Sequence, residues 1–203
     1  MIVDTVPAHY TAWKAITNEL NIEFTEEDNE QLKGVSRIES MNRILELGGV
    51  TLEQDEIEKL VTRKNDIYVS IISNMTRADI LPGVMETLDL LKRNDIAAAI
   101  GSSSKNATRI LESIGLTEEF EVIVDGNQIK NSKPDPEVFL LAAEKLGKSP
   151  EQCTVIEDAF SGVEAAKRGG MHCIGVGKQE VLNEADVVIP SMESFSLILV
   201  YQN

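Results

Sequence analysis

From about residue 80 onward, short apolar runs alternate with segments of helical periodicity, and this alternation restricts the possible folds most strongly. The runs are 96–100, 121–124, 153–156, 172–176 and 186–189, and helices are expected at about 84–94, 105–115, 136–147 and 161–169. Such alternation is typical of βαβ units, in which helices cover both faces of a parallel sheet. We therefore expect an α/β fold built on a parallel sheet.

Before residue 80 the pattern has a different period. From about residue 7 to 75, apolar residues recur at three- and four-residue spacing, which predicts helices throughout. Examples are Ala8, Ala12, Trp13, Ile16 and Leu20, and later Ile57, Leu60, Val61 and Tyr68. The sequence Leu-Pro-Gly at 81–83 opens the alternating region. The boundary between the two regions is therefore expected near residues 76–80.

The charge balance excludes several classes of partner. The 203 residues carry a formal net charge of −15, whereas nucleic acids and anionic membrane surfaces attract clustered Lys and Arg. We find neither a signal-peptide pattern nor an apolar stretch near the ~18 residues that a membrane helix needs. Cys153 and Cys173 lack C-x-x-C spacing and are expected to be buried thiols. We expect a cytoplasmic monomer that binds neither nucleic acid nor membranes.

The first candidate site follows the apolar run at 96–100. It has the sequence Gly101-Ser102-Ser103-Ser104-Lys105. Ligands of open parallel sheets bind at the carboxyl ends of the strands. Small hydroxyl residues with exposed backbone N–H groups before a helix form an anion-binding corner. The alternative is that Ser103 or Ser104 is only a helix N-cap.

Two further segments carry ionisable side chains. Lys133 precedes Pro134, which favours an extended backbone at Lys133, and Pro136 is suited to the first position of the next helix. Glu157 and Asp158 follow an apolar run, and adjacent carboxylates suit a hard cation such as Mg²⁺. Taken alone, such a lysine is more often a surface charge, and the carboxylates can equally cap a helix.

Together the three motifs have the order and spacing of the haloacid dehalogenase (HAD) superfamily, and the chain resembles its β-phosphoglucomutase family over essentially the whole length. The resemblance is carried by QLKGVSRIES (31–40), TRKNDIYV (62–69), GSSSKN (101–106), SKPDP (132–136) and VIEDAFSGVEAAK (155–167). It implies a HAD-like Rossmannoid core formed by residues 1–6 and 76–203. Residues 7–75 would form an inserted helical cap.

The resemblance also implies roles for individual residues. Ser102, Ser103 and Lys133 would hold the transferring phosphate, and Glu157 and Asp158 would bind Mg²⁺. The second phosphate of a phosphorylated hexose would contact Arg37, Ser104, Lys105 and Asn106. The cap side would be lined by His9, Trp13, Gly34, Val35, Ser36 and Lys64, with Asp4 and Thr5 at the hinge. Three of these residues have simpler interpretations: Trp13 as a core residue, Lys64 as a solvated charge and His9 as a helix cap.

The chain departs from the family pattern at its start. Family members begin with an apolar strand, the central one of the sheet, that ends in Asp-x-Asp. The first Asp carries the phosphoryl group and the second is the general acid/base. No Asp-x-Asp occurs in these 203 residues. The resemblance implies interconversion of β-glucose 1-phosphate and glucose 6-phosphate through an aspartyl phosphate, but we expect this 203-residue form to be inactive and to bind Mg²⁺ weakly or not at all.

Three explanations of this departure remain open. In the first, an N-terminal segment is missing from the sequence, and the full-length protein is a mutase or a HAD phosphatase acting on small phosphorylated metabolites. In the second, the chain is a homologue that binds sugar phosphates without converting them. In the third, it is an interaction module that retains the motifs as relics. The first is favoured because the other expected site residues are present.

Overall fold

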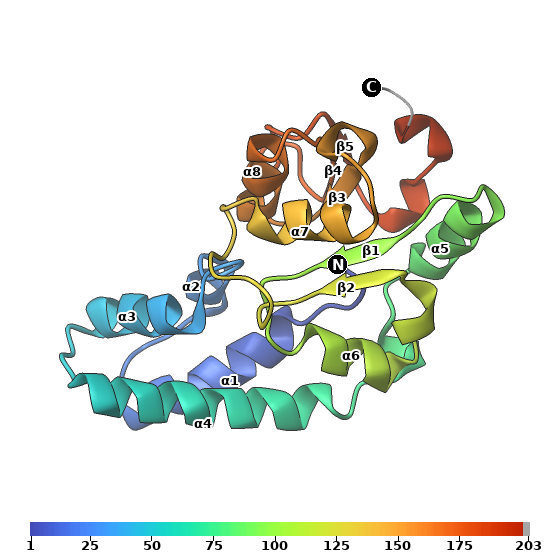
Figure 1. The fold of residues 1–203 in the computed structure, drawn as a ribbon. Helices are drawn as coiled ribbons and strands as arrows, with labels where there is room; N and C mark the ends of the chain where they lie inside the picture. Colours follow the sequence, from blue (N-terminus) through green and yellow to red (C-terminus); the bar gives the residue numbers. More distant parts are fainter. Residues whose placement is uncertain (201–203) are drawn as a thin grey trace. The chain divides into compact units, whose positions relative to one another are not determined.

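The computed structural model describes residues 1–200, which divide into two compact units (Figure 1). The helical unit is Asp4–Met75, and the core unit contains Met1–Val3 and the chain from Thr76 onward. Val3 forms an isolated antiparallel bridge with Ile80. This bridge joins the short N-terminal segment of the core unit to the stretch in which the chain returns from the helical unit.

The helical unit consists of four α-helices around one apolar core. They are α1 (Val6–Glu19), α2 (Glu26–Glu30), α3 (Arg37–Gly48) and α4 (Gln54–Ile72). Helix α1 packs against α4 and α2, and α3 packs against α4. The core includes Trp13, Ile16, Phe24, Met41, Ile44 and Val61. Local signals set the helix limits: Ser36 caps α3 by accepting a hydrogen bond from Glu39 N at 3.3 Å, and Gly49 ends α3 at φ 62°.

The core unit alternates strands and helices as its sequence pattern predicts. Its strands are β1 (Ala99–Gly101), β2 (Val122–Val124), β3 (Thr154–Glu157), β4 (His172–Val176) and β5 (Val187–Ile189). Its α-helices are α5 (Val84–Arg93), α6 (Ala107–Ile114), α7 (Glu137–Lys145) and α8 (Phe160–Arg168). Short 3₁₀ helices are η1 (Arg77–Asp79), η2 (Thr117–Glu119), η3 (Pro150–Gln152), η4 (Met192–Ser194) and η5 (Leu197–Leu199).

All strand pairs are parallel, but they form two separate sheets. One is β1–β2, with Ile100 opposite Ile123; the other is β3–β4–β5, with Val155 opposite Cys173. Within the described residues, β1 pairs with β2 alone and β3 with β4 alone. Each of these two strands therefore has one edge without a strand partner.

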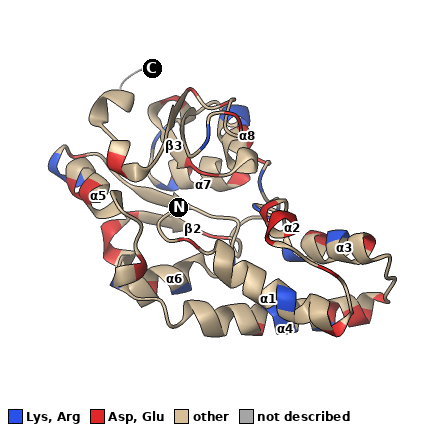
Figure 2. Cartoon of the chain, turned by 180° about the vertical axis from the view of Figure 1, so that it is seen from behind, with Lys and Arg blue, Asp and Glu red and all other residues tan. Residues whose placement is uncertain are grey.

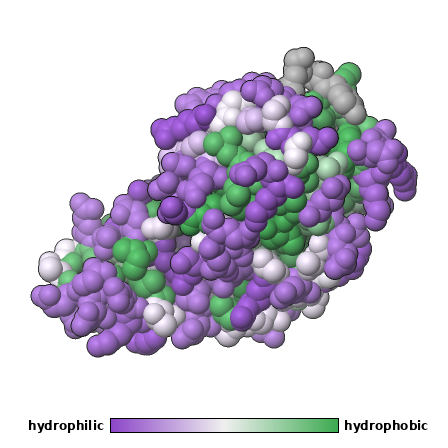
Figure 3. All heavy atoms as spheres, in the orientation of Figure 1, coloured by the Kyte–Doolittle hydropathy of each residue, from purple (hydrophilic) through white to green (hydrophobic). Residues whose placement is uncertain are grey.

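One apolar core connects the two sheets. Helix α7 packs on β1 and β2, whereas α8 packs on β3 and β4. The same cluster of buried side chains includes Val124 of β2, Val138 and Phe139 of α7, Val155 of β3 and Cys173 of β4. Hydrophobic side chains also reach the surface in the region of α7 and β1 (Figure 3). The apolar layer is therefore continuous across both sheets but not completely covered.

Charged residues are spread over both units. Figure 2 shows acidic and basic residues interspersed on helices of both, so the net charge of −15 is not confined to one surface. None of the helices within residues 1–200 combines the length and apolarity needed to cross a membrane.

Candidate functional site

The structure brings the three motifs of the core unit together at the carboxyl ends of β1 and β3. The Lys133 ammonium donates hydrogen bonds to Gly101 O at 3.2 Å and to Glu157 Oε1 at 2.5 Å. The backbone N–H of Lys133 donates to Ser103 Oγ at 3.3 Å. We call Ser102, Ser103, Lys133, Glu157 and Asp158 the core cluster. Three segments distant in sequence thus meet around one ammonium group.

Lys133 and Glu157 form a buried ion pair. Their side chains are only 9% and 10% exposed, and Lys133 Nζ also lies 4.4 Å from the centre of the Phe139 ring. Burial alone would raise the pKa of Glu157, but the charge and hydrogen bond of Lys133 outweigh burial and hold this pKa well below its usual value. The Met1 ammonium contributes in the same direction. The interpretation of Lys133 as a surface charge is therefore wrong.

The carboxylates of the core cluster fit a hard cation only in part. Glu157 Oε1 is paired with Lys133, while Oε2 accepts hydrogen bonds from Asp158 N at 2.7 Å and Ala159 N at 3.4 Å. Asp158 is exposed. Within the described residues, no group of three or more His, Cys, Asp or Glu side chains is placed to hold a metal ion. Two carboxylate oxygens suit Mg²⁺, but the other ligands would have to come from water or a bound phosphate.

The serine hydroxyls shape the loop that follows β1. Ser102 Oγ accepts a hydrogen bond from Ser104 N, and Ser104 Oγ accepts one from Asn106 N, both at 3.2 Å. Asn106, not Ser103 or Ser104, occupies the N-cap position of α6. The N-cap interpretation of these serines is therefore wrong: the Ser104 hydroxyl bonds within the loop, and the Ser103 hydroxyl accepts from Lys133 N. Pro136 likewise stands at the N-cap of α7 and not at its first helical position.

A second cluster lies in the helical unit around Lys64. Lys64 Nζ is 2.8 Å from His9 Nδ1, and it lies 4.8 Å and 4.7 Å from the ring centres of Trp13 and Tyr68. Lys64 is only 1% exposed and Trp13 only 2%. We call His9, Trp13, Lys64, Tyr68 and the nearby Arg37 the helical cluster. Lys64 is not a solvated charge, and Trp13 is both a core residue and part of this cluster.

In the helical cluster, the pKa values of His9 and Lys64 are lowered by burial and by neighbouring positive charges. Burial, then the charges of Lys64 and Arg37, lower the pKa of His9 to about 3, so the ring is neutral at pH 7. When Lys64 is protonated, the neutral ring accepts its hydrogen bond at Nδ1. Burial, followed by the charge of Arg37, lowers the pKa of Lys64 to about 7. An anion near this cluster would favour the charged lysine.

The remaining residues predicted for the cap side and the hinge all belong to the helical unit. Gly34 has φ 76°, a left-handed conformation that glycine adopts without strain. Val35 is half-buried beside it, and the hydroxyl of Ser36 is engaged in capping α3. Asp4 Oδ1 accepts a hydrogen bond from Val6 N at 2.9 Å. Thr5 forms a hydrogen bond with Tyr68, whose pKa burial raises to about 12.

The residues expected to contact the second phosphate belong to different units. Arg37 begins α3 in the helical unit, and burial lowers its pKa. Ser104, Lys105 and Asn106 lie between β1 and α6 in the core unit. Asp125 is not among the residues predicted from the sequence, and its turn is hydrogen-bonded to this loop. The available signal was an acidic residue followed by glycine directly after an apolar run.

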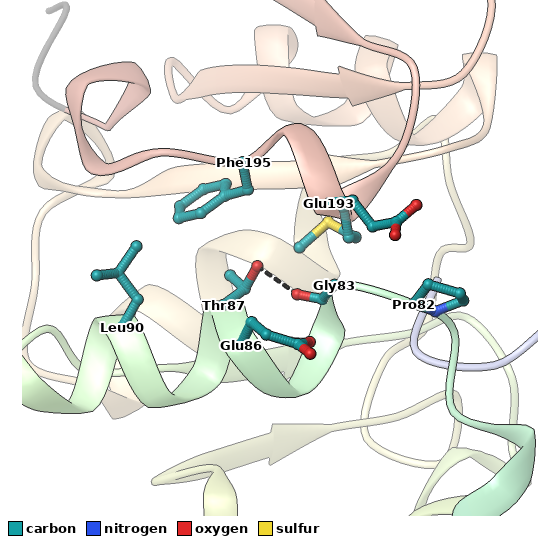
Figure 4. A pocket seen from close by; sticks show the side chains of 8 residues that line it. Pro82, Gly83, Glu86, Thr87, Leu90, Glu193 and Phe195 are labelled. Carbon is teal, nitrogen blue, oxygen red and sulfur yellow. Dashed lines mark hydrogen bonds between the residues drawn. The ribbon is translucent and has the colours of Figure 1, made fainter.

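A cavity of about 320 Å³ lies elsewhere in the core unit, between α5 and η4 (Figure 4). It is lined by Pro82, Gly83, Glu86, Thr87, Leu90, Met192, Glu193 and Phe195. The Thr87 hydroxyl donates a 2.7 Å hydrogen bond to Gly83 O. None of these residues belongs to the core cluster, and both charged groups are carboxylates. The lining therefore offers no cationic side chain to pair with a phosphate.

Comparison with known proteins points to one family. The profile of the haloacid dehalogenase-like hydrolases matches residues 1–176. A β-phosphoglucomutase from Bacillus subtilis (strain 168) is 40% identical over 204 residues, which cover 100% of this chain and 90% of that protein. A phosphorylated carbohydrates phosphatase from Thermotoga maritima is 31% identical, covering 93% of this chain and 86% of that protein.

The solved structures agree with the sequence comparison. A crystal structure of β-phosphoglucomutase from Clostridium difficile superposes with a TM-score of 0.94 at 37% identity. The match covers 100% of this chain and 92% of that chain. The α/β class and the HAD-like fold expected from the sequence are therefore confirmed.

Proposed function

Because the chain belongs to the haloacid dehalogenase-like hydrolase family, we propose that its ligand is a phosphorylated hexose, bound as in a β-phosphoglucomutase-type phosphotransferase. The observation that carries the proposal is the core cluster at the carboxyl ends of β1 and β3. There a lysine ammonium lies beside a loop of three serines. Ammonium and hydroxyl groups are strong donors to phosphate oxygens. The similarity to the Bacillus subtilis β-phosphoglucomutase supports a sugar phosphate as the ligand.

We further propose that these 203 residues bind the sugar phosphate without converting it. The chemistry of the family needs a carboxylate nucleophile and a second carboxylate as general acid/base. Glu157 is a poor substitute for the nucleophile because Lys133 and the Asp158 N–H hold its oxygens. Asp4 is no substitute either, because it belongs to the helical unit and bonds to Val6 N. Mg²⁺, if bound, would supply charge neutralisation between Glu157, Asp158 and the phosphate.

Titration calorimetry with glucose 6-phosphate tests the binding proposal. Wild-type protein should bind at millimolar concentration or below, with little change when Mg²⁺ is chelated. Arg37→Ala should weaken binding. Arg43→Ala is the matched control, because Arg43 lies on the same helix in an exposed pair with Glu39. Absence of heat with demonstrably folded protein would favour the interaction-module explanation, and a strict requirement for Mg²⁺ would show that the metal site is more complete than proposed.

Lys133 needs a more careful variant than alanine. Removing one partner of a buried pair leaves the other charge unpaired, at a cost of about 3–5 kcal/mol. We therefore expect Lys133→Ala to lose binding and much of its stability. The double variant Lys133→Met with Glu157→Gln removes both charges at once. It should fold, as circular dichroism would verify, and should still fail to bind glucose 6-phosphate.

An activity assay tests the absence of conversion. The purified chain, with Mg²⁺ and a hexose bisphosphate primer, should not interconvert β-glucose 1-phosphate and glucose 6-phosphate above background. Release of inorganic phosphate should be measured in parallel, because the phosphatase from Thermotoga maritima is also similar to this chain. Isomerisation or phosphate release, lost in the folded double variant Lys133→Met with Glu157→Gln, would refute the inactive assignment and identify the reaction.

A further inference from the structure

The turn that follows β2 is hydrogen-bonded to the loop that follows β1. This loop contains Ser102, Ser103, Ser104 and Lys105, and we call it the serine-lysine loop. The turn consists of Asp125, Gly126 and Asn127, and we call it the Asp125 turn. Its second and third residues hold the loop at two neighbouring carbonyl groups: Gly126 N donates to Ser104 O at 3.1 Å, and Asn127 Nδ2 donates to Lys105 O at 3.0 Å. The strands themselves continue this pattern, because Ser102 N donates to Val124 O at 2.9 Å. The loop is therefore held by the turn and not only by its own hydroxyls.

The carboxylate of Asp125 is the centre of the turn. Asp125 is only 5% exposed. Its Oδ2 accepts hydrogen bonds from Thr108 Oγ1 at 3.0 Å and from Asn127 Nδ2 at 3.2 Å, and its Oδ1 accepts one from Asn127 N at 2.9 Å. A buried carboxylate is costly unless it is well hydrogen-bonded, and here three donors satisfy it. Thr108 lies in the first turn of α6, so the carboxylate ties the start of this helix to β2.

The turn and the loop also touch closely at their backbones. A Cβ atom added to Gly126 would lie 2.3 Å from Ser103 O and 3.1 Å from Lys105 Cγ. Such distances leave no room for a side chain. The close contact of Gly126 with Ser103 and the hydrogen bonds to Ser104 O and Lys105 O together restrict the position of the loop.

We propose that Asp125 is a positioning residue. Through Thr108 and Asn127 its carboxylate holds Lys105 and Asn106 in the conformation that binds the anionic ligand. The identity of the ligand, a hexose phosphate, rests on the proposed function, whereas the geometry of the turn does not. Asp125 is negatively charged, like the ligand, and is therefore not expected to contact the ligand directly. Asp125 acts on binding only through the segment that it holds.

The sign of the charge distinguishes positioning from plain electrostatics. A carboxylate near an anion site repels the anion, so neutralising it should tighten binding if charge were its only effect. A positioning role predicts the opposite for Asp125→Asn, since an asparagine has only one acceptor oxygen and its NH₂ group would face a donor at the other position. Glu112→Gln on α6 is the charge control, because Glu112 is exposed on the same helix.

The test measures glucose 6-phosphate binding by calorimetry and amide hydrogen exchange of the unliganded protein in the same variants. Asp125→Asn and Thr108→Val should weaken binding by about fivefold or more. Thr108→Ser, which keeps the hydroxyl, should bind like the wild type, and Glu112→Gln should bind at least as tightly. Amides of residues 104–107 should exchange faster in Asp125→Asn and Thr108→Val, with those of α7 unchanged.

Each result decides between the alternatives. Tighter binding by Asp125→Asn, or equal loss in Thr108→Ser and Thr108→Val, would overturn the positioning role. Faster exchange throughout the core unit would show that Asp125 is only a general structural residue. If the wild-type protein binds no hexose phosphate, the proposed function fails, and the exchange of residues 104–107 still supports or refutes the hold of Asp125 on the loop.

Discussion

Lys64 is an ammonium group buried among aromatic rings, a position that a folded protein normally gives to an uncharged side chain. Its close neighbours are His9, Trp13 and Tyr68, and within the described residues no ion pair is formed with a carboxylate. Burial and the charge of Arg37 lower its pKa from 10.5 to about 7. The folded state therefore loses free energy whenever this lysine is protonated.

This cost predicts how stability depends on pH. Between pH 7 and about 10.5 the unfolded chain holds the Lys64 proton and the folded chain does not, so the free energy of unfolding rises with pH in this window. The full penalty, roughly 3–5 kcal/mol, is present below pH 7. Lys64→Met should therefore be most stabilising at pH 6 and lose this advantage toward pH 10.5, as measured by urea unfolding.

Lys59→Met is the control for that experiment, because Lys59 is exposed on the same helix. It should change stability by a small, pH-independent amount. A similar pH dependence in wild type and Lys64→Met would contradict the prediction. The buried position could have been anticipated, because Lys64 is three residues after Val61 and four before Tyr68, on the apolar face of α4. The spacing does not reveal the polar partner of Lys64, because His9 belongs to another helix, α1.

Gly162 leaves space for the buried ion pair. A Cβ atom at this position would lie 2.0 Å from Glu157 Oε1, within α8. Gly162→Ala should therefore displace the carboxylate from Lys133 and lower the melting temperature by several degrees, despite the better helix propensity of alanine. Gly169→Ala, where the nearest atoms are 3.3 Å away, should shift it much less. Equal melting temperatures for the two variants would refute this reading of Gly162.

At the scale of elements, the open edges of β1 and β3 are the feature that most affects stability. Unpaired main-chain groups at strand edges are costly when apolar neighbours limit access of water. Met1–Val3 belong to the same unit as these strands, and the charge of the Met1 ammonium helps to lower the pKa of Glu157 at the end of β3.

We predict that an added strand stabilises the core unit. An extended apolar segment of about six residues, fused ahead of Met1, should raise the melting temperature and slow amide exchange in β1 and β3. A Gly/Ser segment of equal length is the control and should leave both quantities unchanged. If the apolar segment also had no effect, the edges of β1 and β3 would not accept a strand.

The elements of the core unit could largely be predicted from the sequence, because each strand is a short apolar run bounded by helical periodicity. The run at 172–176 coincides with β4, and α8 begins one residue before its predicted start. The run at 96–100 was placed too early, since β1 is Ala99–Gly101. The reason is that Ile96 N bonds back to Leu91 O at the end of α5. Such local closure depends on hydrogen bonds that apolar periodicity does not encode.

The candidate site was harder to predict than the elements. Four of the five residues of the core cluster stand at the ends of β1 and β3, so their assembly could be expected from topology, whereas Lys133 comes from the segment between β2 and α7. The burial of the Lys133 side chain and the role of the Asp125 turn depend on side chains from other segments. Neither the packing of Phe139 beneath Lys133 nor the bond from Thr108 to Asp125 leaves a local sequence signal.

For the whole molecule, the chain passes between the two units after Val3 and after Met75, next to the hinge segments predicted at 4–6 and 76–80. Limited proteolysis of the unliganded protein should cut near these crossings before it cuts within either unit, because segments between compact units open at low cost. Mass spectrometry of the first fragments would locate the cuts. Early cleavage inside α3 with both crossings protected would contradict the division into separately stable units.

The Lys133 ammonium has a consequence for the unfolding reaction. It bonds at once to the last residue of β1 and to the last residue of β3, and the apolar cluster beneath spans β2, β3 and β4. Separation of the two sheets would expose the Lys133 ammonium and the apolar cluster to which both sheets contribute. The core unit should therefore melt as a single cooperative transition, with β1 and β3 gaining protection from exchange together, although no backbone hydrogen bond joins their strands.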